Sequence, residues 1–386
     1  MRIIMIGQKG LPTQYGGIER HVEELSIRLA KEGHDVLAYV RDWYTPKTIR
    51  SFGGIKLIHT PTIHSKHLDA IVHTFISTIH ALFQKADVIH YHGVGPALLS
   101  FIPRIFAPKT KVIATFHCID RYHQKWGLFA QLLLRLGEKA ACLFPHETIA
   151  VSKTIQNYCL NEYQKNTTFV PNGVTMPGQV DSKSLEQWNL QPNNYVLMVS
   201  RLVKHKGAHY LIDAWKKLQQ KNPDLIAGKK LVIVGDSAFT DSYVESLKEA
   251  AKSDPTIVFT GWQRGQTLED LYGNTALLVH PSENEGLPLT VLQAMAHGRP
   301  VLVSDIPEHQ EVITNEQFHF RNANTASLVE KLAALLGNTK KLSETGLRNK
   351  NTAFTNYQWE KIAGDTVAVY GTNPTATFKT VRAIEA

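Results

Sequence analysis

Short runs of β-branched and other apolar residues alternate with helical stretches along this chain of 386 residues. The first round extends through residue 170 and contains RIIMI, DVLAYV, DVIHY, KVIAT and ETIAV. The second round contains YVLMVS, KLVIVG, TIVFTG, ALLVHPS and PVLVS. Such alternation is typical of parallel strands, because a chain can return parallel to itself only through a crossover, which is usually a helix. We therefore predict an α/β protein with two doubly wound, Rossmann-like domains.

The two rounds are separated by residues 174–194, which are rich in Pro, Gly, Ser and Asn and have no sustained apolar period. We predict an N-terminal domain over 1–175, a linker over 176–194 and a second domain over 195–356. Apolar residues at helical spacing in YQWEKIAGDTVAVYG predict a helix over 357–371, followed by a flexible tail over 372–386. Ligands of such sheets bind beyond the carboxyl ends of the strands, so two facing domains would form a deep cleft.

Targeting and membrane-spanning signals are weak in this sequence. The first apolar run ends within a few residues at Gly7, which is too short for the core of a secretory signal. The stretch LFAQLLLRLGEKAACLF is interrupted by Arg135, Glu138 and Lys139, whereas a spanning helix needs about 20 mostly apolar residues. The three cysteines lack metal-type spacing and suit reduced thiols. These features predict a cytoplasmic protein.

The positive charge lies in the first half of the chain. Residues 1–175 hold 20 Lys and Arg against 12 Asp and Glu, and residues 176–386 hold 22 of each, so the net +8 falls entirely in the first half. A basic half can face nucleic acid, an anionic membrane, a phosphorylated substrate or only solvent. Nucleic acid is disfavoured because no RNA-binding motif or aromatic-basic platform accompanies the charge. The segment RYHQKWGLFAQLLLRLGEKAACLF fits either a helix lying on the inner face of the plasma membrane or a buried core helix.

A glycine pair precedes the first predicted helix. In GQKGLPTQYGGIERHVEELSIRL, Gly16 and Gly17 would let backbone N–H groups approach an anion at the positive helix end. The segment lacks GxGxxG and is therefore not a dinucleotide fingerprint. A tight strand-to-helix turn explains the glycines equally well. Glu19 is either a first-turn carboxylate that suits the helix dipole or a residue that contacts an acceptor substrate.

Two cations follow the first strand of the second round. Arg201 and Lys206 in SRLVKHKG are five residues apart and could close on a diphosphate, Arg as a planar fork and Lys as a point charge. The alternative is a solvated basic loop, and Lys204 fits that alternative better.

An acidic loop leads into a helix in HPSENEGLPLTVLQAM. Gly286 and Pro288 predict the N-terminus of a helix that points into the cleft between the predicted domains. Pro288 is expected in the first turn of that helix. A carboxylate repels phosphate but accepts hydrogen bonds from hydroxyls, so Glu285 suits a sugar. Glu283 fits a solvated loop acid instead.

The histidines and acids offer little to a metal ion. His90 and His92 flank a predicted strand end. They either ligate a metal or line the part of the cleft that binds an acceptor substrate. No Cys or carboxylate with ligand spacing accompanies them, and no Asp-x-Asp is present to hold a divalent ion on phosphates. We predict no metal and no cofactor.

Taken together, these motifs resemble the family-4 glycosyltransferases of GT-B fold, over nearly the whole chain. GLPTQYGG and HCIDRYHQKWG further resemble a bacterial subgroup that builds cell-surface polysaccharides, including rhamnosyl-, galactosyl- and mannosyltransferases. The motifs that carry the family resemblance are GG-x-E, the His that ends KVIATFH, PNGV at 171–174, SR-x4-KG, PS-x-x-EG with a polar residue eight positions after the Glu, AMAHGRPV, and YQWEKIAGDTVAVY.

The resemblance implies a retaining hexosyltransferase. Its donor would be a UDP-, dTDP- or GDP-sugar, its acceptor a glycan or a polyprenyl-diphosphate-linked glycan, and its last helix would cross back to the N-terminal domain. By similarity, Arg201 and Lys206 hold the diphosphate, Glu285 binds the donor sugar and His117 lies against it. The remaining donor-binding residues implied are Gly16, Gly17, Gly261, Gln263, Gly286, Leu287, Pro288, Leu289 and Gln293. Candidate residues on the acceptor side are Glu19, His92, Asp120 and Asn172.

Two positions depart from the family pattern. An Asp often follows the active-site His directly, but here that position is Cys118 and the nearest acid is Asp120. The residue eight after Glu285 is commonly a second Glu that accepts from the donor ribose, but here it is Gln293. An amide has one acceptor oxygen and no charge, so it either binds the ribose less firmly or favours a deoxyribose donor. A catalytically silent nucleotide-sugar-binding protein and a GT-B sugar-nucleotide epimerase remain alternatives.

Overall fold

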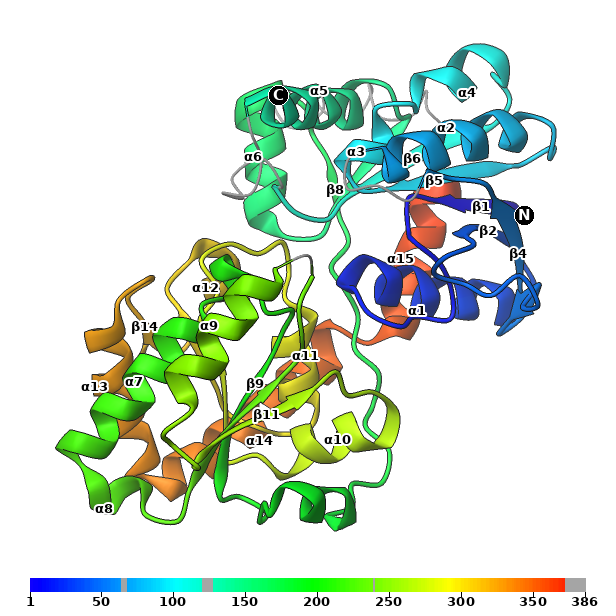
Figure 1. Ribbon diagram of the computed structural model, residues 1–386. Helices are drawn as coiled ribbons and strands as arrows, with labels where there is room; N and C mark the ends of the chain where they lie inside the picture. Colours follow the sequence, from blue (N-terminus) through cyan, green and yellow to red (C-terminus); the bar gives the residue numbers. More distant parts are fainter. Residues whose placement is uncertain (64–67, 120–127, 239, 372–386) are drawn as a thin grey trace. The chain divides into compact units, whose positions relative to one another are not determined.

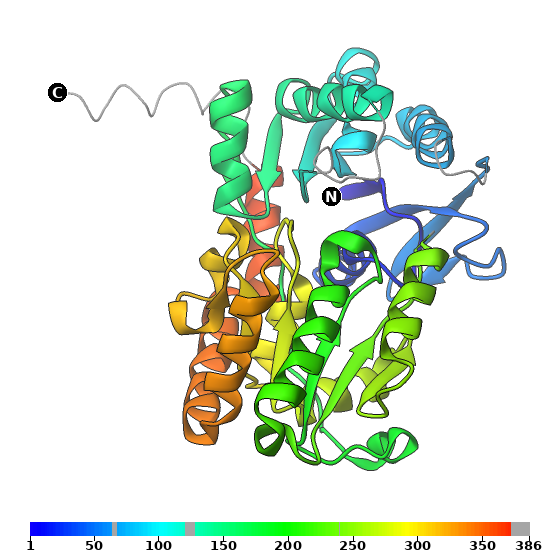
Figure 2. The same cartoon turned by 60° about the vertical axis from the view of Figure 1, so that its left-hand side comes forward.

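The chain folds into two compact units. The computed structural model describes residues 1–63, 68–119, 128–238 and 240–371 (Figures 1 and 2). The first unit contains Met1–Asn172 and the C-terminal segment from Trp359, and the second contains Gly173–Gln358. Each unit has one mainly parallel sheet with helices on both faces. The predicted α/β class with two Rossmann-like domains is therefore confirmed.

The first unit has an eight-stranded sheet in the order β3-β4-β2-β1-β5-β6-β7-β8. All neighbouring strands are parallel except β3 and β4. The central strand β1 is buried on both faces, as its uninterrupted apolar run predicts. The strands are β1 (Arg2–Ile6), β2 (Asp35–Arg41), β3 (Ser51–Phe52), β4 (Ile55–Thr60), β5 (Val88–His92), β6 (Lys111–Phe116), β7 (Glu147–Ala150) and β8 (Thr168–Phe169).

The helices of the first unit divide between the two faces of this sheet. The chain moves from β1 to β2 in one direction and returns from β4 to β5 in the other. Because crossovers are right-handed, this reversal places α1 on one face and α2 to α6 on the other, with a topological switch point between β1 and β5 (Figure 1). The helices are α1 (Gly17–Lys31), α2 (Asp69–Leu82), α3 (Val94–Ala97), α4 (Phe101–Phe106), α5 (Leu128–Leu143), α6 (Lys153–Tyr163) and α15 (Trp359–Gly371).

Helix α15 returns to the first unit and packs beside α1. Trp359 is 2% exposed, and its ring lies 5.4 Å from that of His21 on α1. At the other end of α15, the Tyr370 hydroxyl shares a 2.8 Å hydrogen bond with His90 Nδ1. Lys111 Nζ donates to the carbonyl of Val369 at 2.6 Å. The predicted return of the C-terminal helix to the N-terminal domain is confirmed.

The second unit has a six-stranded parallel sheet in the order β11-β10-β9-β12-β13-β14. The chain moves from β9 outward to β10 and β11, then returns to β12 on the opposite side of β9. The switch point of this sheet therefore lies between β9 and β12. The strands are β9 (Tyr195–Val199), β10 (Lys230–Val234), β11 (Ile257–Gly261), β12 (Leu277–His280), β13 (Val301–Ser304) and β14 (His319–Phe320).

The helices of the second unit also form two layers. Helix α13 packs against α7 on one face of the sheet, and α14 packs against α11 on the other. The buried stripe of α7 contains the predicted residues Ala208, Leu211, Ile212, Trp215 and Leu218. The helices are α7 (Ala208–Lys221), α8 (Pro223–Ile226), α9 (Asp241–Ala251), α10 (Gly265–Asn274), α11 (Leu289–Ala296), α12 (Pro307–Val312), α13 (Thr325–Leu336) and α14 (Thr339–Asn356).

Residues 176–194, predicted as a linker, instead form part of the second unit. Leu185 lies in the short 3-10 helix η2 (Lys183–Trp188) and is fully buried. The Asp270 carboxylate of α10 accepts hydrogen bonds from the Asp181 N–H at 2.9 Å and the Ser184 hydroxyl at 2.6 Å. One apolar anchor and a few polar contacts suffice to fix this segment, and neither produces the periodic signal of a long helix or strand.

Candidate active site

In the second unit, the predicted donor-binding residues gather at the switch point of the sheet. Arg201 lies just beyond the carboxyl end of β9, and Glu285 follows the carboxyl end of the neighbouring strand β12. Gly261 ends β11, on the far side of β10. The loops after three strands, β9, β11 and β12, therefore carry these residues at one edge of the sheet, which is where open α/β sheets bind ligands.

Lys206 reaches Glu285 because the two loops are joined through their backbones. Lys206 ends the 3-10 helix η3 (Lys204–Lys206), and the Glu283 N–H donates to the carbonyl of His205 at 2.8 Å. Gly207 has φ +76°, and a Cβ there would lie 2.1 Å from the Pro281 carbonyl oxygen. This close approach requires glycine, because any side chain would push the two loops apart.

Glu285 is a buried carboxylate held in its ionised form. Burial by itself would raise the pKa of Glu285, but the ammonium of Lys206 and the hydrogen bond from His280 hold it well below the usual value. Lys206 Nζ donates to Glu285 Oε1, and His280 Nε2 donates to the same oxygen at 2.7 Å. The second carboxylate oxygen has no partner among these groups and can accept a hydroxyl.

The loops after β9 and β12 also carry donors without partners among the described residues. The partly buried guanidinium of Arg201 makes no hydrogen bond or ion pair within the described part of the chain. In the same part, no hydrogen bond uses the backbone N–H groups of Gly286 and Leu289. The sequence predicted Pro288 in the first turn of α11. Pro288 is instead the N-cap, because the first helical residue is Leu289. A positive helix end, free N–H groups and a guanidinium are the kinds of group that bind an anion in proteins.

Gln293 and Gln263 follow two different strands, β12 and β11, at this edge of the sheet. Gln293 lies one turn into α11, on the same side as Leu289, and it is partly exposed. Its side-chain amide has no hydrogen bond within the described residues. Gln263 follows β11, and its amide donates to the carbonyl of Thr260 at 2.7 Å. The Gln293 amide is thus available to a ligand, whereas the Gln263 amide holds its own loop.

In the first unit, three histidines meet at the carboxyl ends of β5 and β6. His92 ends β5, His117 follows β6, and His21 comes from α1. His92 Nδ1 lies 3.3 Å from His117 Nε2, and the rings of His21 and His117 have centroids 4.8 Å apart. Only 7% of His117 is exposed.

The other candidate residues of the first unit belong to its internal hydrogen bonds. The Glu19 carboxylate accepts from the Lys9 N–H at 3.1 Å. Gly16 caps α1 at φ +111°, and a Cβ there would lie 1.8 Å from Glu19 Oε2. Asn172 Oδ1 accepts from His21 Nδ1 at 2.9 Å. Glu19 therefore holds the loop before Gly17, and Asp120 lies outside the described residues.

Two groups of side chains have the ligand atoms that a metal ion needs, with those atoms within 4.8 Å of one another. In the group His280, Glu285 and His309, the Lys206 ammonium already neutralises the carboxylate and would repel a cation. The group His21, His92 and His117 offers neutral imidazoles, which suit a transition metal. Hydrogen bonds already use three of their nitrogens: His21 Nδ1 bonds Asn172, and His92 Nδ1 bonds His117 Nε2. The absence of a metal remains a prediction.

Burial keeps four histidines of the first unit, His21, His90, His92 and His117, neutral. It lowers the pKa of His21 to about 4 and that of His90 to about 3. Burial, together with the neighbouring histidines, holds the pKa values of His92 and His117 well below the usual value. A proton on any one of them would be buried beside three other rings.

This burial predicts a loss of stability in acid. Because the folded-state pKa values lie below the unfolded value of about 6.5, the unfolded state binds more protons as the pH falls from 6.5 to about 4. We expect the melting temperature of the first unit to fall over this window. His90→Gln should flatten the dependence, whereas the control His34→Gln, at a less buried position, should not. A wild-type melting temperature that does not change between pH 6.5 and 4.5 would contradict this account.

Three residues of the site were not singled out from the sequence. His280 and His309 are buried with ring centroids 5.4 Å apart, and burial lowers the pKa of His309 to about 3. Glu308 lies in the first turn of α12, beyond β13, and burial raises its pKa to about 7. These residues could have been found from the sequence, because His280 ends β12 and the other two follow β13 closely. Both strands are evident as apolar runs.

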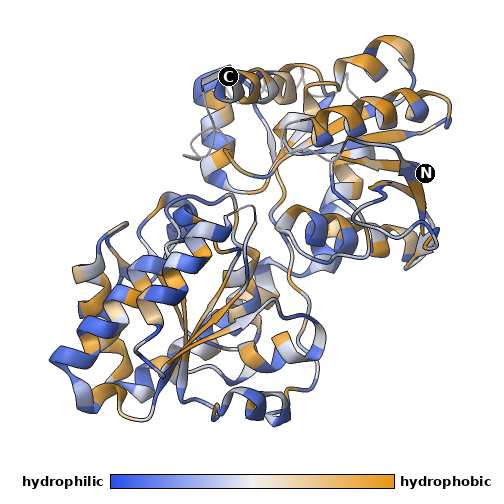
Figure 3. Cartoon of the chain, viewed as in Figure 1, coloured by the Kyte–Doolittle hydropathy of each residue, from blue (hydrophilic) through white to orange (hydrophobic). Residues whose placement is uncertain are grey.

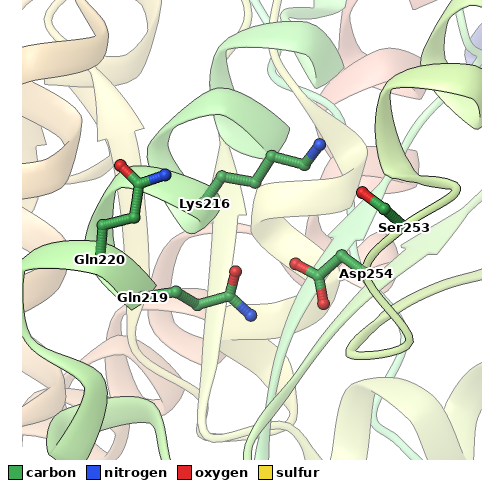
Figure 4. A pocket seen from close by; sticks show the side chains of 5 residues that line it. All are labelled: Lys216, Gln219, Gln220, Ser253 and Asp254. Carbon is green, nitrogen blue, oxygen red and sulfur yellow. The ribbon is translucent and has the colours of Figure 1, made fainter.

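A depression on the second unit lies away from this site (Figure 4). It is lined by the end of α7 and by Ser253 and Asp254, which precede β11. These residues stand at the amino edge of the sheet, opposite the edge that carries Arg201. Gln219 and Asp254 both bond Thr256 Oγ1, at 3.0 and 2.7 Å, so the depression is built from structural contacts and has no evident role in catalysis.

Comparison with known proteins decides the family. The model described as Glycosyltransferase Family 4 matches residues 15–176, and the model described as Glycosyl transferases group 1 matches residues 181–352. The chain is therefore a glycosyltransferase, with a family 4 domain followed by a group 1 domain. The resemblance inferred from the sequence motifs is confirmed.

This glycosyltransferase is similar to proteins of archaea and bacteria. It is 25% identical to an uncharacterized glycosyltransferase of Methanocaldococcus jannaschii, over 96% of this chain and 98% of the relative. It is 24% identical to the O-antigen chain mannosyltransferase C of Escherichia coli, over 79% and 80%. It is also 24% identical to the Escherichia coli UDP-Gal:alpha-D-GlcNAc-diphosphoundecaprenol alpha-1,3-galactosyltransferase, over 60% and 61%.

Solved structures confirm the GT-B fold of the glycosyltransferase. HepE of Anabaena, in complex with UDP and glucose, has a TM-score of 0.79 at 19% identity and covers 96% of this chain and 99% of its own. Sucrose-phosphate synthase of Thermosynechococcus elongatus has a TM-score of 0.81 at 20% identity and covers 96% and 98%.

Proposed function

We propose that this glycosyltransferase transfers a hexosyl group, with retention of configuration, from a nucleoside diphosphate sugar to a glycan or lipid-linked acceptor of a bacterial surface polysaccharide. The observation that carries the proposal is the edge between β9 and β12, where Arg201, the N-terminus of α11 and Glu285 come together. Free donors suit a diphosphate, and an ionised carboxylate beside them suits sugar hydroxyls.

The nucleotide sugar is supported by the chemistry of this edge. A carboxylate beside a bound phosphate would be repelled unless a cation lies between them, and Lys206 supplies that cation. Lys206 can therefore contact Glu285 and a phosphate oxygen together, since an ammonium has three donors. Arg201, which has no partner among the residues that the structure describes, can bind the diphosphate as a planar fork.

The proposed catalysis is electrostatic. As the bond from the sugar to the diphosphate breaks, negative charge grows on the leaving phosphate and the sugar becomes oxocarbenium-like. Lys206, Arg201 and the positive end of α11 stabilise the first charge, and ionised Glu285 orients the sugar hydroxyls. We assign no general base to the protein, and the leaving phosphate oxygen would take the proton of the acceptor hydroxyl. His117, by its place in the family motif, is proposed to contact the donor sugar.

The acceptor and the place of action are proposed from the relatives. One is named as acting on a diphosphoundecaprenol-linked sugar, and another as an O-antigen chain mannosyltransferase. A polyprenyl-diphosphate-linked acceptor would hold the enzyme at the inner face of the plasma membrane, in the cytoplasm. Of the described helices, none is long and apolar enough to cross a bilayer.

A donor panel tests this function. The protein is incubated with UDP-, dTDP- and GDP-sugars, each with and without a membrane extract containing lipid-linked glycans, and release of nucleoside diphosphate is measured. We expect release that depends on both the donor and the extract. Binding of a donor without release supports the silent nucleotide-sugar-binding alternative, and conversion of the donor without an acceptor supports the epimerase.

Gln293 is expected to bear on the choice of nucleotide. A hydrogen bond to a charged acceptor contributes about 1.5 to 3 kcal/mol, against roughly 0.5 to 1.5 for a neutral one, so a carboxylate should bind a ribose diol more firmly than this amide. We expect dTDP to compete well with UDP in the wild type and Gln293→Glu to shift preference toward UDP. Dissociation constants of UDP and dTDP for both proteins measure the shift. Gln310→Glu, an exposed change on α12, controls for added charge. An unchanged UDP/dTDP ratio leaves Gln293 as a plain hydrogen-bonding residue.

A further inference from the structure

Helix α2 has its polar residues inside and its apolar residues outside. The side chains that face the sheet are His73, Thr74, Ser77, Thr78 and Ala81 and are buried. The opposite side carries Ile71, Phe75 and Ile79, which are 48%, 50% and 37% exposed. Surface helices of globular proteins normally have the reverse arrangement. Covering this exposed stripe with an apolar environment outside the unit would therefore be favourable.

The same face of the first sheet continues this exposed apolar area. Helices α2, α4 and α5 lie along one face of the sheet, and apolar residues are prominent on all three (Figures 1 and 3). The rings of Phe101 on α4 and Phe144, just beyond α5, lie 5.6 Å apart and connect the two helices. The exposed large apolar residues of this face are Ile71, Phe75, Ile79, Phe83, Phe101, Ile105, Phe106, Leu132, Leu136, Leu143 and Phe144.

Cations border this apolar area. On residues 69–119 and 131–144, the exposed basic side chains are Lys85, Arg104, Lys109, Arg135 and Lys139. Two acids of the same ranges are buried in structural bonds: Asp69 pairs with Arg41, and Glu138 accepts from two tyrosine hydroxyls. The remaining acid, Asp87, accepts from the backbone N–H of Arg2. The segments that carry the apolar area therefore expose five cations and one acid, so their exposed charge is positive.

We propose that this surface, formed by the exposed residues of α2, α4 and α5, docks onto an anionic lipid bilayer. Large apolar side chains enter the boundary between headgroups and acyl chains, while Lys and Arg extend to the lipid phosphates. A second copy of the chain is a poorer occupant, because a two-fold interface through this surface would bring the two sets of cations together. This surface contains none of the residues proposed to bind the donor. A test of docking is therefore independent of a test of the proposed sugar transfer.

Vesicle binding tests the proposal directly. The full-length protein is sedimented with vesicles of phosphatidylcholine alone and of phosphatidylcholine with phosphatidylglycerol, without donor or acceptor. We expect binding to the anionic vesicles that weakens with salt, since the cations contribute. Phe75→Ser/Ile79→Ser/Phe83→Ser should lower the partition coefficient at least tenfold. The matched control Leu160→Ser/Leu347→Ser changes residues that are 42% and 63% exposed elsewhere and should bind as the wild type does.

A second pair of variants separates charge from apolar contact. Arg104→Gln/Arg135→Gln/Lys139→Gln should lower binding to anionic vesicles several-fold and remove most of its salt dependence. Lys248→Gln/Lys252→Gln/Lys340→Gln removes the same charge from the second unit and should have little effect. All of these side chains are exposed, so melting temperatures should change little and the fold should be kept.

Three results would overturn the proposal. The first is wild-type protein that does not sediment with anionic vesicles, and the second is serine variants that sediment as well as the wild type. The third is a wild-type dimer that the serine variants convert to a monomer, without vesicle binding in either form, which would assign the surface to a second copy. Sedimentation velocity over a range of protein concentrations measures the oligomeric state.

Discussion

Lys206→Ala should lower turnover more than tenfold at saturating donor. Lys206 supplies the positive charge beside the buried carboxylate of Glu285, and its loss removes stabilisation of the leaving diphosphate. A tenfold loss corresponds to about 1.4 kcal/mol of activation free energy. Release of nucleoside diphosphate measures turnover, and unchanged turnover would remove Lys206 from the mechanism.

The same substitution has a separate cost in stability. Removing one partner of a buried ion pair typically costs about 3 to 5 kcal/mol, because the remaining charge stays buried. The double variant Lys206→Met/Glu285→Gln leaves no buried charge at this pair and should regain much of the lost melting temperature without regaining turnover. Lys204→Ala, at the exposed start of the same loop, is the matched control and should retain both. If the double variant recovers turnover, the loss in the single variant came from unfolding.

Truncation after Gln358 should unfold the first unit or strongly destabilise it. It removes α15, whose buried side chains include Trp359, Ile362 and Tyr370. Burying a large apolar side chain contributes about 1.5 to 3 kcal/mol, and a whole domain is stable by only about 5 to 15 kcal/mol. Thermal unfolding should then show an early transition of the first unit, and turnover should be lost.

Truncation after Gly371 is the control, since it keeps every residue of α15. We expect it to melt as the full chain does. Trp359→Ala gives a graded version of the same test, because deletion of a buried Trp side chain typically costs about 3 to 5 kcal/mol. If the protein truncated after Gln358 keeps the melting temperature and turnover of the wild type, α15 is not needed by the first unit.

Several features could be read directly from residue patterns. The apolar runs that predicted strands correspond to β1, β2, β5, β6 and β7 in the first unit and to β9 to β13 in the second. Glycines and prolines marked the loops after those strands, so the ligand edge followed from chain order alone. Arg201, Lys206 and Glu285 could be selected because each lies in a loop that follows such a strand.

Other features depended on contacts between distant segments. The hydrogen bond from His280 to Glu285 joins residues five apart, but it forms only because β12 ends where η3 packs against it. The histidine group of the first unit collects side chains from positions 21, 92 and 117. Residues 176–194 lacked periodicity, yet Leu185 and Asp270 fix them to the second unit. Local composition carries no information on such pairs.

Residue patterns alone predict the α/β class, the two rounds of strands and helices, the family resemblance and the loops that carry the chemistry. Those features follow from hydrophobic periodicity and from residues with special backbone geometry, which are local properties of the chain. The tertiary structure alone decided the charge state of Glu285, the neutral histidines and the exposed apolar side of α2. Each depends on burial and on neighbours brought from elsewhere in the chain. In α2 the apolar period predicts a helix, but only the packed neighbours decide which side of that helix meets the sheet.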